Sequence, residues 1–158
     1  MKRFLILLLS LTAICSAQEK KNYRPLLKDL NKMLKSAEEF SWMYEPDFTT
    51  VQSYEVDEDG KLSVIIKGKA GDAEVIHKYE APLNEIYDFV MDIYYVISFK
   101  SKSVIISELK EGKWIEIERR DFFHLGKPKE EDAHKWSHKL RADFNELYPL
   151  ENEYEDMD

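Results

Sequence analysis

Residues 51–119 form a series of short segments in which apolar and polar side chains alternate, with turn signals between them. Alternation with a period of two places successive side chains on opposite faces of a strand, so the pattern is typical of half-buried β-strands. At its centre, two β-rich runs at 93–99 and 104–108 flank the polar connection 100–102. This spacing predicts a hairpin, and the whole stretch predicts an antiparallel sheet.

The predicted sheet has about six strands, separated by turns that contain glycine or polar residues. Its strands are expected at 51–56, 62–67, 73–80, 92–99, 104–109 and 114–119. Residues 82–90 fit neither periodicity cleanly, and we expect an irregular or helical turn there. In the last strand, Ile115 and Ile117 are expected to face the core, with Glu116 and Glu118 in water.

Helical periodicity appears in the sequence both before and after the predicted strands. Between residues 23 and 40, apolar side chains recur three and four positions apart, and Pro25 falls in the first turn, where its missing N–H is harmless. A second helix is expected to begin at Pro128 and to end before Pro149, with acidic residues in its first turn. Its apolar face consists of Ala133, Trp136, Leu140, Phe144 and Leu147.

These patterns predict one α+β domain at residues 18–150, in which an N-terminal and a C-terminal helix flank a curved or half-barrel antiparallel sheet. A hydrophobic content of 44% is sufficient for a packed core. Trp42 and Tyr44, in the connection after the first helix, are expected to close one end of that core. The half-open barrel closed by the final helix resembles pleckstrin-homology-type folds, a likeness of fold that implies no function.

Residues 1–17 have the layout of a secretory signal peptide. Lys2 and Arg3 precede the apolar run 4–11, and small residues lead to a predicted cleavage after Ala17. The run is too short for a membrane span, so no span is expected in the mature chain. Lipidation of Cys15 is the alternative, but Ile14 stands where lipoprotein signals carry a small residue.

We therefore expect an exported protein, periplasmic or extracellular, whose mature chain has no cysteine and hence no disulfide. In layout the chain resembles small exported proteins of unassigned function from Gram-negative bacteria. The formal net charge is −8, and residues 151–158 form an acidic tail that we expect to be disordered. Because a phosphate backbone selects clustered Lys and Arg, nucleic acid is not an expected partner.

His134 and His138 form the pattern that most resembles a metal site. Four positions apart on a helix, they share a face and could chelate one ion. A third ligand would have to come from His124 or Glu131. The alternative interpretation is a solvated polar helix face on which Glu130 supports His134 one turn away.

The sequence contains no Gly-x-Ser-x-Gly motif, and its five glycines are scattered as turn residues rather than gathered in a phosphate-binding loop. No catalytic residue or cofactor is therefore expected, and enzymatic activity is disfavoured. Several tyrosines fall in the predicted sheet, where they either pack in the core, which we favour, or form an aromatic surface for a peptide, glycan or apolar molecule. They are Tyr54, Tyr79, Tyr87, Tyr94 and Tyr95.

The sequence thus predicts a small exported, non-catalytic binding or interaction module. Its expected partner is a protein, a peptide or a small apolar ligand, and the residues that bind it are not assigned. The alternative is a small metal-binding protein that uses the helical face of His134 and His138.

Overall fold

The computed structural model describes residues 21–42, 48–91 and 93–150. The predicted signal peptide 1–17 and acidic tail 151–158 lie outside the described residues. The elements, in chain order, are α1 Arg24–Ser36, β1 Thr49–Val56, β2 Lys61–Ala70, β3 Ala73–Pro82, the 3-10 helix η1 Leu83–Glu85, β4 Ile86–Met91, β5 Tyr95–Phe99, β6 Val104–Lys110, β7 Lys113–Arg120, β8 Phe122–Gly126, the 3-10 helix η2 Glu130–Asp132 and α2 Ala133–Leu147.

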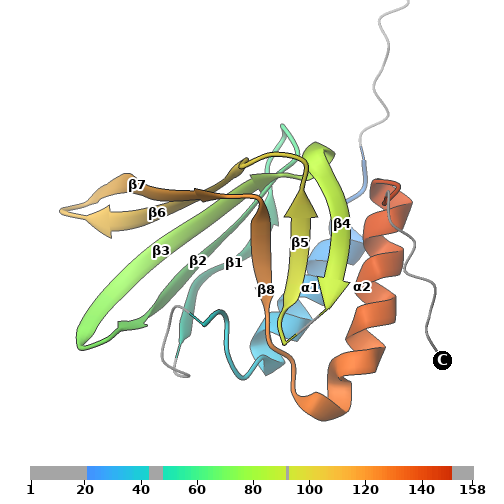
Figure 1. The fold of residues 1–158 in the computed structure, drawn as a ribbon, viewed down its shortest axis with the longest axis horizontal. Helices are drawn as coiled ribbons and strands as arrows, with labels where there is room; N and C mark the ends of the chain where they lie inside the picture. The colour runs from blue at the N-terminus through green and yellow to red at the C-terminus, as the bar shows by residue number, and fades with distance from the viewer. Residues whose placement is uncertain (1–20, 43–47, 92, 151–158) are drawn as a thin grey trace, which may run out of the picture.

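The strands form two antiparallel sheets, as Figure 1 shows. The larger sheet has the order β1-β2-β3-β6-β7, and the smaller has the order β4-β5-β8. The predicted α+β class with one N-terminal and one C-terminal helix is confirmed. The predicted single sheet was wrong, and neither sheet curls into a half-barrel. The likeness to pleckstrin-homology-type folds rested on that curvature and loses its basis.

The two sheets arise because the chain leaves the larger sheet after β3 and returns to it only for β6 and β7. The amide of Leu83 donates to the carbonyl of Gly60 at 3.0 Å, which anchors η1 beside the turn between β1 and β2. From η1 the chain enters β4, so residues 82–90, predicted as irregular or helical, contain most of a strand. Ile86 and Phe89 are buried there, and Phe89 lies opposite Ile97 of β5.

The predicted hairpin between residues 93–99 and 104–108 was also wrong. The strand β5 pairs with β4 and β8, whereas β6 pairs with β3 and β7. The connection at 100–102 therefore carries the chain from one sheet to the other. Backbone bonds at the end of β5 fix that departure, because Phe99 N–H donates to Asp121 at 2.8 Å and Lys100 N–H donates to Glu85 at 3.1 Å.

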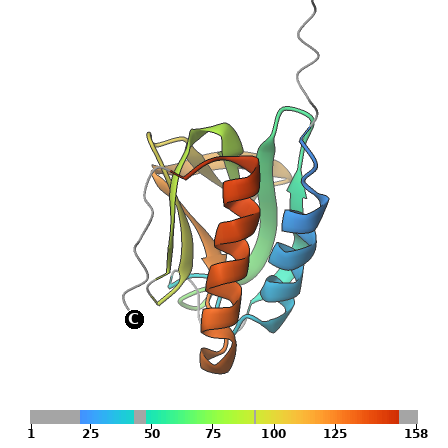
Figure 2. The same cartoon turned by 90° about the vertical axis from the view of Figure 1, so that its right-hand side faces the viewer.

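The helices α1 and α2 pack against each other, and Figure 2 shows them side by side in front of the strands. Helix α1 also contacts β1 and β8, and α2 contacts β4. The predicted apolar faces are confirmed: Leu26, Leu30 and Met33 of α1 are fully buried, as are Leu140 and Phe144 of α2.

Both helices are shorter than their periodicity suggested. After α1 ends at Ser36, Glu38 and Glu39 form backbone bonds of 2.9 and 2.7 Å with Lys127, at the end of β8. Before α2, the amide of Asp132 donates to the carbonyl of Lys129 at 2.9 Å, so the first turn is a 3-10 turn.

The core lies between the helices and the two sheets, and it contains several of the tyrosines. Tyr54, Tyr79 and Tyr95 are at most 1% exposed, so for these three the packing interpretation is confirmed. Trp42 is 63% exposed and does not close the core as expected, and Tyr44 lies outside the described residues. Among the helices of the described residues, none is long and apolar enough to cross a membrane.

Candidate interaction surface

The helix face that was predicted as a possible metal site is exposed. His134 and His138 both lie on the solvent side of α2, whereas Trp136 is 3% exposed on the core side. His124, considered as a third ligand, is buried on β8, and Glu131 is exposed in η2. Within the described ranges, no three His, Cys, Asp or Glu side chains gather closely enough to hold a metal ion. The two-histidine site stays a prediction.

His124 lies between two aromatic rings on the small sheet, with ring centroids 5.4 Å from Tyr94 and 5.3 Å from Phe122. Burial, with a smaller contribution from the nearby Arg120 charge, lowers the pKa of His124 from 6.5 to about 4. The imidazole is therefore neutral at pH 7, and it packs against the two aromatic rings without carrying a charge.

Tyr94 also takes part in a polar contact that joins the end of α1 to the small sheet. Its hydroxyl donates to Glu39 Oε2 at 2.5 Å, and Lys127 Nζ lies 3.5 Å from Glu39 Oε1. The hydrogen bond from Tyr94 lowers the pKa of Glu39, and burial raises the pKa of Tyr94 to about 12. This group closes the connection after α1 and has a structural role.

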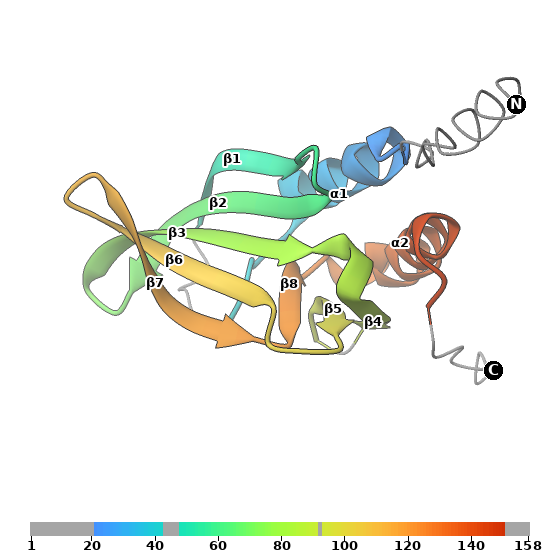
Figure 3. The same cartoon turned by 90° about the horizontal axis from the view of Figure 1, so that it is seen from above.

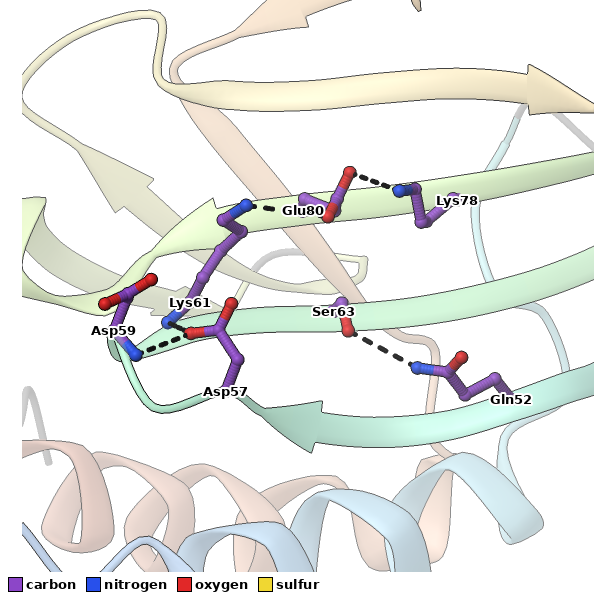
Figure 4. A network of polar contacts seen from close by, with 7 residues as sticks. All are labelled: Gln52, Asp57, Asp59, Lys61, Ser63, Lys78 and Glu80. Atoms are coloured by element: carbon purple, nitrogen blue, oxygen red, sulfur yellow. Dashed lines mark hydrogen bonds and ion pairs between the residues drawn. The ribbon is translucent and has the colours of Figure 1, made fainter. Parts of the chain in front are cut away.

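The outward face of the larger sheet carries a network of polar side chains, shown in Figure 4. The carboxylate of Asp57 accepts the amides of Asp59 and Lys61 at 3.0 and 2.9 Å, which stabilises the turn before β2. The carboxylate of Glu80 forms two ion pairs, with the ammonium of Lys61 at 3.7 Å and with that of Lys78 at 2.7 Å. These charges pair with one another within the sheet, so their clustering does not by itself indicate a ligand site.

Ser107 and Lys110 have the spacing Ser-x-x-Lys of a nucleophile and its base. They lie on β6, where residues three positions apart point to opposite faces of the sheet. The ammonium of Lys110 instead lies 2.9 Å from the carboxylate of Glu108. This arrangement does not form a catalytic pair.

The end strands of the two sheets differ in how well their free backbone edges are covered. On β1, the side chain of Asn31 from α1 accepts the amide of Tyr54 at 2.8 Å and donates to its carbonyl at 3.0 Å. On β8, the Tyr54 hydroxyl donates to the carbonyl of Leu125 at 2.8 Å. On β4, Arg141 of α2 lies 3.8 Å from Asp88. Side chains of the helices or of the core thus contact three of the four end strands, and on β1 they bond to the backbone on both its donor and its acceptor side.

The fourth end strand, β7, carries three exposed apolar side chains among charged ones. It stands at the end of the five-stranded order, and Figure 3 shows it along a side of the molecule away from both helices. Trp114, Ile115 and Ile117 are 37%, 46% and 41% exposed. Trp114 and Ile115 are consecutive in the strand and point to opposite faces. We call these three side chains and the outward backbone of β7 the β7 edge.

The charged residues of β7 pair with one another. Arg119 makes two bonds to the carboxylate of Glu116, at 2.7 and 2.9 Å, and Arg120 makes two to Glu118, at 2.5 and 2.6 Å. Glu116 and Glu118 are thus ion-paired carboxylates rather than an acid–base pair. The Arg120 guanidinium also lies 5.3 Å from the ring centroid of Trp42. This cation–π contact holds the exposed indole beside β7.

The expectation that Ile115 and Ile117 face the core was wrong for two reasons. The strand register shifts between Ile106 and Ser107 of β6, so one residue of β7 is extra and the alternation is broken. The strand also extends past the part of the sheet that the helices cover, as Figure 3 shows. Neither the shift nor the position of β7 in the sheet order can be read from the alternation alone.

Comparison of the chain with models of known protein families, with curated proteins and with solved structures found no match.

Proposed function

We propose that this protein is an exported, non-catalytic interaction module that binds an extended segment of a partner protein along β7. The observation that carries the proposal is the β7 edge itself, in which Trp114, Ile115 and Ile117 stand exposed along an end strand. In such a complex the segment adds as a further strand to the five-stranded sheet. Main-chain hydrogen bonds supply affinity, and side-chain contacts on either face supply specificity.

The contrast among the end strands supports this assignment. Side chains from the helices or the core bond to β1 and β8, whereas β7 presents apolar side chains at its free edge. An exposed edge that carries large apolar residues invites pairing with another strand. The register shift opposite Ile106 and Ser107 limits regular pairing, which favours a short partner segment over open-ended stacking of strands.

The charges of β7 define the chemistry of that segment. Since Glu116 pairs with Arg119 and Glu118 pairs with Arg120, the strand offers no unpaired carboxylate or guanidinium from these four residues to a partner. A charged side chain placed opposite them would have to compete with an existing ion pair. The segment is therefore expected to be uncharged at its centre and to carry apolar residues on both of its faces.

A photo-crosslinking amino acid at position 117 tests the proposal, with the same group at Val51 as the matched control. Val51 is 55% exposed on β1, the opposite end strand of the same sheet, where Asn31 covers part of the edge. Irradiation of producing cells should give an adduct at position 117 whose crosslinked peptide is extended and apolar. Position 51 should give that adduct in much lower yield.

The identified segment is then synthesised and titrated against the purified protein. Ile117→Lys should weaken binding at least about tenfold, because it places an unpaired charge against an apolar strand, while Val51→Lys should leave binding unchanged. Strand addition should also slow amide exchange along β7. Equal adducts at both positions, or binding that survives Ile117→Lys, would contradict the proposal. A second copy of this chain in the adduct would replace it with self-association.

A further inference from the structure

Two exposed tryptophans lie at the two ends of β7, and each contacts a cation. Trp114, near the start of the strand, is 37% exposed, and the ammonium of Lys78 lies 5.3 Å from its ring centroid. Trp42, from the connection after α1, is 63% exposed, and the guanidinium of Arg120, the last residue of β7, lies 5.3 Å from its ring centroid. Both ends of the strand thus carry a large apolar ring that a partner can reach.

Both cations are themselves held by carboxylates. Lys78 pairs with Glu80 at 2.7 Å, and Arg120 makes two bonds to Glu118, at 2.5 and 2.6 Å. The Arg120 guanidinium also lies 5.1 Å from the ring centroid of Phe122, so it contacts two aromatic rings at once. A ring that is held in place before binding loses little conformational freedom when a partner covers it. Tryptophan is also over-represented among the residues that dominate binding energy at interfaces.

The two tryptophans lie on opposite faces of the larger sheet. Trp114 is opposite Leu109 of β6, and Arg120, which holds the other indole, is opposite Val104. Leu109 and Val104 are five positions apart, so the side chains of the two pairs point to opposite faces. β7 needs six positions for the same distance, because Ile117 is the extra residue at the register shift. A segment along the free side of β7 should span this distance as β6 does, in five positions, or roughly 17 Å at about 3.4 Å per residue.

The cations also restrict the chemistry of the partner side chains. Because a positive group already lies against each ring, a second one brought to the same ring would meet like-charge repulsion. A large apolar side chain instead gains buried area on the open part of each indole. Given the proposed binding of a segment along β7, on which this inference rests, we propose that Trp42 and Trp114 are its two anchor residues. The segment presents one large apolar side chain to each indole, five positions apart and on opposite faces.

Three dye-labelled peptides of alternating threonine and serine test the proposal. The first carries two leucines five positions apart, the second carries them four positions apart, and the third carries none. In the second peptide both leucines point to one face, so only one indole can be covered. Fluorescence anisotropy with the purified mature protein should show that the first peptide binds at least about tenfold more tightly than either of the others, since burial of one leucine is sufficient for that factor.

Trp42→Ala should remove the preference for the first peptide, whereas Trp42→Phe, which keeps an aromatic ring, should retain most of it. Ile93→Ala is the matched control, because it removes a side chain that is 62% exposed between β4 and β5, and it should leave the preference unchanged. Equal binding of the first two peptides, a preference that survives Trp42→Ala, or no binding of the first peptide would overturn the inference. Crosslinking at position 117 tests strand addition without these peptides, so the two-anchor inference can fail while the proposed function stands.

Discussion

The His124 imidazole is 5% exposed on β8, and its pKa is lowered from 6.5 to about 4 by burial. In the unfolded chain the ring takes up a proton as the pH falls through 6.5, while in the folded chain it stays neutral until about pH 4. The unfolded state therefore binds more protons between these values, and folding stability falls with the pH. The stability that the neutral ring contributes is complete above pH 6.5.

His124→Leu should flatten this dependence. The lowered pKa of His124 corresponds to roughly 3 kcal/mol of free energy of unfolding. As the pH falls from 7.5 to 4.5, the wild type should therefore lose roughly 2–3 kcal/mol more of its free energy of unfolding than the variant does. Urea denaturation at each pH measures the difference. Because Glu39 titrates in both proteins, its effect cancels in the comparison. His134→Ala, an exposed control, should keep the wild-type slope. Parallel curves for His124→Leu and the wild type would contradict the prediction.

At the scale of single elements, α2 separates a core face from a solvent face. Trp136 is 3% exposed and belongs to the core cluster, and its indole N–H is buried without a hydrogen-bond partner in the described part of the chain. His134 and His138 project on the exposed side. The two faces should therefore respond very differently to substitution.

Trp136→Ala should destabilise the protein by about 3–5 kcal/mol, because it opens a cavity under α2. Trp136→Phe should cost less, since it keeps an aromatic ring and removes a buried N–H that lacks a partner. Chemical denaturation of the three proteins gives the order. A loss below about 1 kcal/mol for Trp136→Ala would mean that the indole is not packed in the core.

His134→Ala combined with His138→Ala should change the stability by no more than about 0.5 kcal/mol, because both side chains are exposed. Alanine is also the better helix former, which shifts the small effect towards stabilisation. Thermal melts with zinc, and with a chelator, decide between a solvated face and a metal site. If zinc raises the wild-type midpoint by several degrees and the double variant does not respond, a metal site is present.

The elements differ in how far local sequence determines them. Both helices were predictable, because Leu26, Leu30 and Trp136 report a buried face through spacing alone. The strands of the larger sheet were also found, with ends displaced by a few residues. The partners of β5 were not predictable, because an alternating run fits equally well beside β6 or beside β4 and β8. That choice depends on contacts distant in sequence, such as Phe99 with Asp121.

At the scale of the whole molecule, the predicted and proposed sites depend on tertiary placement. Local alternation in β7 suggested that Ile115 is buried, but its exposure follows from the position of β7 at the end of the larger sheet. The contact between α1 and α2 likewise joins segments more than a hundred positions apart in the chain, as the hydrogen bond between Tyr23 and Tyr148 shows, and no local pattern predicts it.

The layout of residues 1–17 predicts that the mature protein begins at Gln18. Intact-mass spectrometry of the exported protein should show the loss of residues 1–17, with or without cyclisation of the new N-terminal glutamine. A replacement of Ala17 by a bulky residue should leave the precursor uncut. An unprocessed N-terminus in the wild type, or a lipid on Cys15, would contradict the prediction.

The hydroxyl groups of Tyr23 and Tyr148 lie 2.8 Å apart, so the entry to α1 and the exit from α2 meet at one point of the surface. A short flexible linker could therefore join these two positions without distorting the domain. New ends could then be opened at an exposed hairpin tip such as Gly71 or Gly112. A circularly permuted chain of this kind should fold to the same architecture.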